Sequence, residues 1–312
     1  MQLRSQVEYF GRALLERGAS NPNIVVLDSD VSASTKTSYF QESFPDRFIE
    51  VGISEQDIIG MSAGLALTGK IPVAAAFATF IVGRAWEQIA NTVARQNLNV
   101  KIVGTHSGLS PSADGESHQS IADIALMRVL PNMLVECPAD AAAAGSTTKS
   151  LIDHRGPVYL RLIRGNSPVV YPDGFEIKIG VAQTLNEGED VTIIAAGNMV
   201  AVALDASKVL EEENVSVNVI DMHTIKPLDH STINEAALRT GAIITLEEHS
   251  IIGGLGGAIA EAVSESNPVP VLRIGVKDRF GQSSRNYQAL LERYGLTSES
   301  VVMAARKILK ER

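Results

Sequence analysis

Short runs of apolar and β-branched residues alternate along the chain with segments whose apolar residues recur at helical spacing. This alternation is typical of crossover units, which connect the strands of a parallel sheet through helices. In the N-terminal half it predicts strands at Ile24–Leu27, Pro72–Phe77, Lys101–Thr105, Met133–Cys137 and Val158–Ile163. It predicts helices there at Arg4–Arg17, Asp57–Leu67, Gly83–Gln96, Ser120–Val129 and Asp140–Asp153.

The alternation lapses between Ser167 and Gly180, where Ser-Pro, Tyr-Pro and Asp-Gly pairs favour turns. It resumes with predicted strands at Val191–Ala196, Ser216–Asp221, Ala242–Glu247 and Val269–Ile274, and with predicted helices at Met199–Glu213, Ser231–Arg239, Gly256–Ser264, Arg285–Tyr294 and Ser298–Lys310. We therefore expect an α/β fold of two domains, residues 1–166 and 187–312, joined by a linker over 167–186. Each domain should hold a mostly parallel or mixed sheet flanked by helices.

Composition narrows the function classes. The 312 residues are 45% hydrophobic and 20% charged, as in soluble globular proteins, and no apolar run reaches the ~20 residues of a membrane span. The net charge of -9 and the lack of a Lys/Arg run argue against a nucleic-acid or membrane surface. Cys137 is the only cysteine, which excludes an intrachain disulfide. We therefore expect a cytoplasmic protein.

Glu55 is a candidate catalytic acid, because it ends an extended run directly before a predicted helix. Phe77 and Phe80 lie three residues apart where a strand turns into a helix, and two such rings can clamp a flat heterocycle. Aromatic side chains more often serve core packing, so this second hypothesis is weaker when the rings are taken alone.

Polar side chains follow several predicted strands, at the sheet edge where open α/β folds bind ligands. Asp28 and Asp30 follow the first of these strands, although a turn capped by Asp side chains explains them equally well. His106 follows another strand, and the loop after it carries Asp114 and His118. The two histidines can offer hydrogen bonds in neutral or cationic form near pH 7.

Other interpretations of this loop are a helix cap at Ser117, a metal site and a Ser-His-Asp hydrolase. A flexible Gly/Ser loop rarely holds metal geometry, and the sequence has no Gly-x-Ser-x-Gly elbow. Arg164 ends the last predicted strand of the first domain, where its planar fork suits a phosphate or carboxylate, with an interdomain ion pair as an equal alternative. The glycines between Gly253 and Ala258 do not complete a dinucleotide fingerprint, and we interpret them as close helix packing.

Together these segments resemble the thiamine-diphosphate-dependent transketolase family, specifically its pyrimidine-binding and C-terminal domains, over nearly the whole chain. Four ordered matches are hard to obtain by chance. The family's activating-glutamate motif resembles Gly52-Ile-Ser-Glu55-Gln56, and its cofactor-stacking segment resembles Phe77-Ala-Thr-Phe80 with the following Arg84-Ala-Trp-Glu-Gln. Its Asp-Gly-x-x-His-Gln loop resembles Asp114-Gly-Glu-Ser-His118-Gln119, and a segment near its C-terminus resembles Gly275-Val-Lys-Asp278-Arg-Phe-Gly281.

The resemblance implies a role for each of these residues. Glu55 would hydrogen-bond the aminopyrimidine ring nitrogen of thiamine diphosphate and favour the imino tautomer, whose basic nitrogen removes the thiazolium proton. Phe80, with Phe77 beside it, would stack on the pyrimidine, and Val31 would support the bent cofactor. His118 would also move a proton as the carbon–carbon bond forms or breaks. The residues implied at the sugar phosphate are Arg4, Asp30, Ser34, His106, Asp114, His118 and Arg164.

The resemblance also implies a partner. The family holds the diphosphate and its divalent metal, such as Mg²⁺, through a Gly-Asp-Gly motif and a later Asn-Asn pair, and neither occurs in this sequence. A separate N-terminal transketolase subunit would carry them, and self-association of this chain as a dimer would give a two-plus-two heterotetramer. This chain would then be the C-terminal subunit of a split transketolase, which transfers a two-carbon ketol unit between sugar phosphates and is inactive without its partner.

Gly83-Arg84 stands where typical transketolases carry a third aromatic residue, which is closer to deoxyxylulose phosphate synthases and to the β subunits of 2-oxo acid dehydrogenases. The synthases are single long chains, and the residues implied at the sugar phosphate argue against a dehydrogenase subunit. A non-catalytic scaffold subunit of this fold is a further alternative. Retention of Glu55 and Phe80 argues against the scaffold, because packing does not require a polar group beside an aromatic ring.

Overall fold

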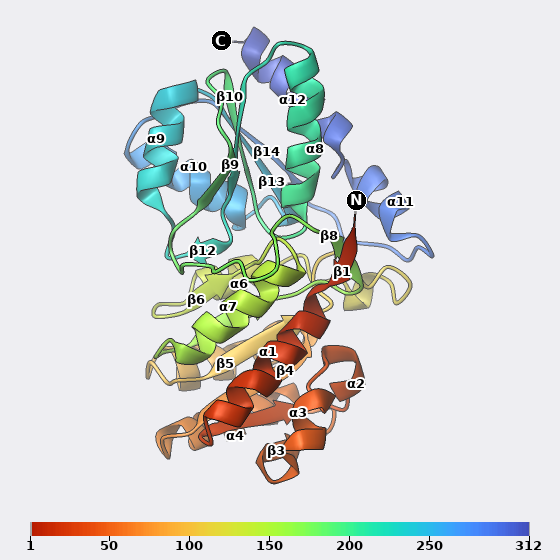
Figure 1. The fold of residues 1–312 in the computed structure, drawn as a ribbon, viewed down its shortest axis with the longest axis vertical. Coiled ribbons are helices and arrows are strands. Elements are labelled where there is room, and N and C mark those ends of the chain that lie inside the picture. The colour runs from red at the N-terminus through yellow and green to blue at the C-terminus, as the bar shows by residue number, and fades with distance from the viewer. Residues whose placement is uncertain (1, 312) are drawn as a thin grey trace.

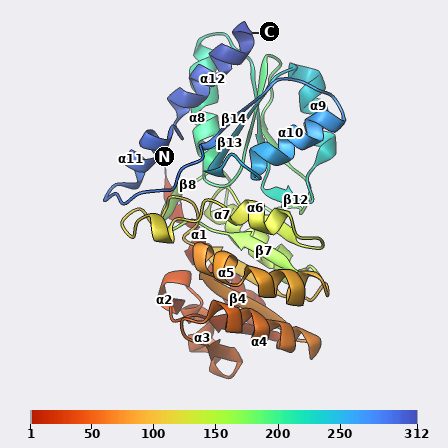
Figure 2. The same ribbon diagram turned by 180° about the vertical axis from the view of Figure 1, so that it is seen from behind.

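The computed structural model of the protein describes residues 2–311, which form two α/β units arranged end to end along the long axis of the molecule (Figure 1). The N-terminal segments build one unit and the C-terminal segments build the other, as the colours from red to blue show (Figures 1 and 2). Within the described residues, no helix combines the length and the apolar character that crossing a membrane requires.

A seven-stranded sheet forms the core of the N-terminal unit, in the order β12-β6-β7-β5-β4-β2-β3. Its strands pair in parallel except β12, which is antiparallel to β6. Every residue of β2 and β5 is buried, as expected for strands that are covered on both faces. The bounds are β2 Ile24–Asp28, β3 Phe48–Glu50, β4 Ile71–Phe77, β5 Lys101–Thr105, β6 Leu134–Glu136, β7 Val158–Arg161 and β12 Thr224–Lys226.

Helices cover both faces of this sheet. On one face lie α1 and α7 (Figure 1), and on the other lie α4 and α5 (Figure 2). The bounds are α1 Gln6–Ser20, α2 Ser32–Thr35, α3 Ser38–Ser43, α4 Glu55–Leu67, α5 Ala78–Arg84, α6 Asp123–Arg128 and α7 Ala141–Asp153, with the π-helix η2 Gln88–Ala94 and the 3₁₀ turns η1 Pro45–Arg47 and η3 Glu116–His118.

The C-terminal unit is built on a five-stranded sheet in the order β14-β13-β10-β11-β9, parallel except for the antiparallel pair β11 and β9. Its strands are β9 Gln183–Asn186, β10 Val191–Ala195, β11 Val217–Asp221, β13 Ile243–Ser250 and β14 Val271–Val276. Its helices are α8 Met199–Glu212, α9 His230–Thr240, α10 Leu255–Glu265, α11 Tyr287–Tyr294 and α12 Ser298–Lys310. The predicted α/β fold, with two mixed sheets flanked by helices, is confirmed.

The helix predicted to begin at Arg4 begins two residues later. Arg4 belongs to β1 Leu3–Ser5, which pairs antiparallel with β8 Asn166–Pro168. Ser5 then caps α1, because its hydroxyl accepts a hydrogen bond from the N–H of Glu8 at 3.4 Å. The prediction was wrong at this position because the strand is created by a distant partner segment.

The single helix predicted over Gly83–Gln96 is also wrong. Helix α5 begins at Ala78, directly after β4, and the chain leaves regular α-helix at Ala85 before η2 begins. The predicted linker over 167–186 contains β8 and β9, and β9 extends the second sheet, whereas β12 from the later segment extends the first. These short strands carry no apolar run, so local periodicity could not reveal them.

Candidate active site

Glu55 is the first residue of α4 and is 1% exposed. The chain reaches it from β3 through Gly52, whose φ of +75° lies in the left-handed region that favours glycine. The side chain of Glu50, at the end of β3, accepts hydrogen bonds from the N–H groups of Gly52 at 2.9 Å and Asp30 at 2.8 Å. The entry to α4 is therefore tied to the loop after the neighbouring strand β2.

The carboxylate of Glu55 forms an ion pair with the guanidinium of Arg84, the last residue of α5. The same guanidinium lies over the ring of Phe80, with 5.0 Å between its central carbon and the ring centroid. The Arg84 side chain is 47% exposed and that of Glu55 is 2% exposed. A planar cation thus bridges a buried carboxylate and an aromatic face at the protein surface.

Two histidines contact the two phenyl rings that follow β4. The ring of His106 stacks on Phe77, with centroids 4.0 Å apart and an interplanar angle of 29°. The ring of His118 meets Phe80 edge-on, at 5.1 Å and 80°. These contacts bring the ends of β4 and β5 and the loop after β5 into one cluster of rings, which continues through Arg84 to the acidic side chain of α4.

Arg164 pairs with Asp114 at 2.5 Å and so joins the segment after β7 to the loop after β5. The N–H of Arg164 also donates to the hydroxyl of Ser110 at 2.9 Å. Both partners of the ion pair lie in the N-terminal unit, so the alternative of an interdomain ion pair is wrong. The guanidinium is 45% exposed and is held by the loop that carries His118.

His106 is neutral at physiological pH. Burial, aided by the nearby Arg164 cation, lowers its pKa from 6.5 to about 4, although Asp114 acts in the opposite direction. Its Nδ1 lies 3.0 Å from the hydroxyl of Thr105. Its φ of +56° is unusual for a residue with a side chain and places this imidazole in a strained turn directly after β5.

The residues after β2 form a hydrogen-bonded turn of their own. Asp28 accepts hydrogen bonds from the N–H of Val31 at 2.8 Å and from the hydroxyl of Thr35 at 2.8 Å, and burial raises its pKa. Asp30, with φ of +62°, and Ser34 are exposed on this turn. The capping interpretation is therefore confirmed for Asp28, whereas ligand contacts of Asp30, Val31 and Ser34 stay predictions.

Arg4, predicted to contact a sugar phosphate, is engaged at the start of α1. Its guanidinium pairs with Asp173 and donates to the hydroxyl of Tyr9 at 2.9 Å. The Asp173 side chain is 63% exposed, so this pair is weakly held. A phosphate contact of Arg4 stays a prediction and would have to replace Asp173.

Within residues 2–311 there is no group of three or more His, Cys, Asp or Glu side chains placed to hold a metal ion. The two histidines of the loop after β5, which were one candidate for such a group, each contact a phenyl ring instead.

Two residues to which the sequence pattern assigned no role belong to this region. Arg84 lies one helical turn after Phe80, so their spacing alone could have placed the guanidinium over the ring. Glu248, in β13, accepts a hydrogen bond from the N–H of Leu109 in the loop after β5 at 2.6 Å. No local signal announces this second contact, because the two residues are 139 positions apart.

Comparison with known proteins agrees with this geometry. The family model of the transketolase pyrimidine binding domain matches residues 5–169, and that of the transketolase C-terminal domain matches residues 180–301. A putative transketolase C-terminal section of Methanocaldococcus jannaschii is 44% identical over 305 residues, covering 97% of this chain and 94% of the relative.

One of the two subunits of an apulose-4-phosphate transketolase from Phocaeicola vulgatus is 40% identical, with 97% of this chain and 96% of that protein covered. A solved structure described as a split gene transketolase, inactive beta4 tetramer, has a TM-score of 0.92 and 50% identity over 98% of both chains. Matches of this extent cover both units and the loops that carry the candidate site. The chain therefore belongs to the transketolase family.

Proposed function

We propose that this chain is the C-terminal subunit of a transketolase that transfers a two-carbon ketol unit between sugar phosphates, with thiamine diphosphate and a separate N-terminal subunit. The arrangement of Glu55, Arg84 and Phe80 carries the proposal. A planar group with N–H donors lies over the phenyl ring and pairs with the buried carboxylate, and an aminopyrimidine would make the same two contacts. The residues present therefore fit the pyrimidine half of the cofactor.

Bound thiamine diphosphate would supply the carbanion chemistry that protein side chains cannot perform. Glu55 would hydrogen-bond a pyrimidine ring nitrogen, and its burial strengthens such a bond because the local dielectric is low. Phe80 would support the ring from one side. His118, in edge contact with Phe80, would move a proton on the substrate.

The sugar-phosphate class is supported by the chemistry of the loop after β5. His106 is uncharged at neutral pH, so it would donate to or accept from a sugar hydroxyl. Arg164 offers a half-exposed guanidinium for the phosphate, and Asp114, which holds it, would accept from a hydroxyl. The name of the Phocaeicola vulgatus relative specifies a phosphorylated sugar, apulose 4-phosphate, which agrees with this class.

A second, different chain is supported by the surface beside Glu55. Ile53, Met61 and Leu67 are 73%, 36% and 68% exposed, and a protein rarely leaves such apolar side chains together in water unless another surface covers them. The sequence lacks the family's Gly-Asp-Gly motif, so the diphosphate and Mg²⁺ would be held by the partner. The related inactive beta4 tetramer supports both self-association and a requirement for a second kind of subunit.

A reconstitution experiment tests the proposal. The chain, a candidate N-terminal subunit and their mixture are each assayed for ketol transfer between sugar phosphates, while calorimetry follows thiamine diphosphate binding in the presence of Mg²⁺. We expect transfer from the mixture alone. Robust transfer by the isolated chain would refute the split site. Normal complex formation without transfer from any donor tried would favour the scaffold alternative.

A further inference from the structure

The segment His106–Gln119, which we call the histidine loop, follows β5 and carries residues proposed to contact the sugar phosphate. The C-terminal unit holds this loop near its start, its middle and its end. The contacts are Leu109 N–H to the Glu248 carboxylate at 2.6 Å, Ser284 N–H to the Ser112 carbonyl at 2.8 Å, and the Gln119 amide nitrogen to the Gln282 carbonyl at 2.9 Å. A loop that extends from one sheet is thus bound along its length by the other unit.

Glu248 makes the most buried of these contacts, being 2% exposed near the end of β13. One of its oxygens accepts the hydrogen bond from Leu109. The other accepts from the amide of Asn198 at 2.8 Å and from the hydroxyl of Tyr287 at 2.6 Å. Burial raises the pKa of Glu248, and these donors oppose the rise because they stabilise the carboxylate.

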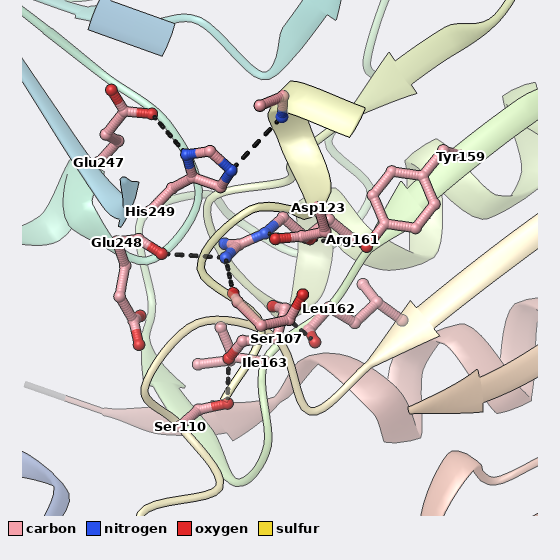
Figure 3. Close-up of polar contacts among 12 residues, drawn as sticks. Ser107, Ser110, Asp123, Tyr159, Arg161, Leu162, Ile163, Glu247, Glu248 and His249 are labelled. Carbon is pink, nitrogen blue, oxygen red and sulfur yellow. Dashed lines mark hydrogen bonds and ion pairs between the residues drawn. The ribbon is translucent and has the colours of Figure 1, made fainter. Parts of the chain in front are cut away.

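The backbone of Glu248 is fixed separately from its side chain. Its carbonyl accepts a hydrogen bond from Arg161 at 2.9 Å, and Arg161 donates to Asp123 at 2.8 Å. Figure 3 shows Arg161 between Asp123 of the N-terminal unit and Glu248 of the C-terminal unit. Since this bridge is buried, the carboxylate of Glu248 is held at a defined place against the histidine loop.

The contact is too close to admit a side chain on the loop. Gly108 has a φ of +63°, and a Cβ atom there would lie 2.6 Å from a carboxylate oxygen of Glu248. At the other end of the loop, a Cβ atom on Gly281 would overlap the amide oxygen of Gln119. One glycine from each unit therefore permits the loop and the C-terminal unit to approach each other this closely.

We propose that Glu248, supported by Asn198 and Tyr287, is a positioning residue that holds the histidine loop in the conformation that binds the sugar phosphate. The proposal rests on the proposed function for the identity of the ligand. Leu109 is close to His106 in the chain, so fixing its N–H restricts the strained turn that presents this imidazole. A contact that served only to join the two units would not act selectively on the loop.

Hydrogen–deuterium exchange with mass spectrometry tests this selectivity. In Glu248→Ala we expect amide exchange in the histidine loop to accelerate about tenfold, as loss of a charged hydrogen-bond acceptor predicts, while exchange in α4 is unchanged. Glu248→Gln should have a smaller effect, because its amide oxygen can still accept from Leu109. Tyr287→Phe keeps the aromatic ring and removes one donor, which covers the case in which Glu248→Ala fails to fold. The matched control is Glu261→Ala, because Glu261 pairs across the units with Arg128 and not with the loop.

Kinetics of the two-subunit enzyme provide the second readout. We expect KM for the sugar phosphate to rise about tenfold in Glu248→Ala, with a smaller change in kcat and with the Kd for thiamine diphosphate within about twofold of wild type. Exchange that is unchanged in both Glu248→Ala and Tyr287→Phe, or that rises equally in Glu261→Ala, would overturn the positioning role. A selective rise in exchange without any rise in KM would overturn it as well. If exchange rises selectively but the wild-type complex transfers no ketol unit, the anchoring of the loop stands and the proposed function fails.

Discussion

The central guanidinium carbon of Arg84 lies 5.0 Å from the centroid of the Phe80 ring, and the same guanidinium pairs with Glu55. The first contact follows from helical spacing, because the two residues are one turn apart at the start of α5 and its end. One face of a phenyl ring accommodates one planar group at a time. Arg84 and an aminopyrimidine would therefore compete for the same position.

We predict that Arg84→Ala raises the affinity of the two-subunit enzyme for thiamine diphosphate by about tenfold, since the cation–π contact and ion pair no longer have to be broken. Titration calorimetry with Mg²⁺ measures this change. Arg95→Ala is the control for loss of positive charge, because Arg95 is exposed at the end of η2. Weaker binding in Arg84→Ala would show instead that this side chain helps to hold the cofactor.

Glu55→Gln should lower kcat by about a thousandfold, within the range typical of groups that transfer or polarise a proton, while cofactor affinity falls far less. The substitution keeps the size of the side chain and removes its charge. Single-turnover kinetics and calorimetry on the same preparation separate the two effects. Glu87→Gln is the control, because Glu87 is an exposed acid that accepts from neighbouring side chains only. Equal activity of Glu55→Gln and wild type would remove Glu55 from the mechanism.

Much of the fold could be predicted because its central strands are apolar throughout. Strands β2, β5 and β10 are buried at every residue, and the predicted ranges agree with them to within one residue at either end. The edge strands could not be predicted in this way. In β12, Thr224–Lys226 alternates polar and apolar residues over one short stretch, and its strand character comes from pairing with β6 across the units.

The candidate site was predictable where a motif lies within one strand-to-helix turn, as for Glu55 and for Phe77 with Phe80. The structure adds contacts between such segments. His106 stacks on Phe77 and His118 meets Phe80, which spacing along the chain cannot show because each pair joins two different loops. The glycines of Gly253–Ala258 also have a different role from the predicted helix packing. The N–H groups at the start of α10 bind the carboxylate of Glu247, and a Cβ on Gly254 would overlap that carboxylate.

Arg164→Lys should raise KM for phosphorylated sugars by about tenfold and leave KM for the corresponding unphosphorylated sugars unchanged, because lysine cannot make the two parallel hydrogen bonds of a guanidinium. Thermal stability should change little, since the pair with Asp114 is partly exposed on both sides. Steady-state kinetics with both substrate forms measure the difference. A uniform rise for both forms would show that Arg164 orders the loop and does not bind phosphate.

His106 should show no protonation between pH 8 and pH 5.5, because burial lowers its pKa to about 4. NMR of imidazole nitrogens in the folded chain measures this directly, with His106→Asn used to assign the signal. The unfolded chain takes up a proton on this residue near pH 6.5 while the folded chain does not, so His106 lowers stability as pH falls from about 6.5 towards 4. A midpoint near 6.5 in the folded chain would contradict the neutral state assumed for sugar binding.

Asp221 should make the protein less stable as pH rises from about 4 to about 7. Burial raises its pKa from 3.8 to about 7, with the nearby His223 opposing the rise. One of its oxygens accepts from the hydroxyl of Tyr171 at 2.7 Å, and the other has no hydrogen-bond partner among residues 2–311. The folded chain keeps the proton in this window and the unfolded chain does not, so the free energy of unfolding falls by up to about 1.4 kcal/mol per pH unit and levels off above pH 7.

Asp221→Asn should remove this dependence, because asparagine does not titrate and its amide oxygen can still accept from Tyr171. Urea unfolding of both proteins at pH 4.5, 6 and 8 measures the change, and the variant should gain stability relative to wild type as pH rises. Some slope must persist in the variant, because burial also raises the pKa of Glu247 to about 7. Asp205→Asn is the control, since Asp205 is exposed beside Lys208 and contributes no such window. If the curves for Asp221→Asn and wild type run parallel from pH 4.5 to 8, Asp221 is already ionised in the fold, and the unpartnered oxygen must then be satisfied by solvent.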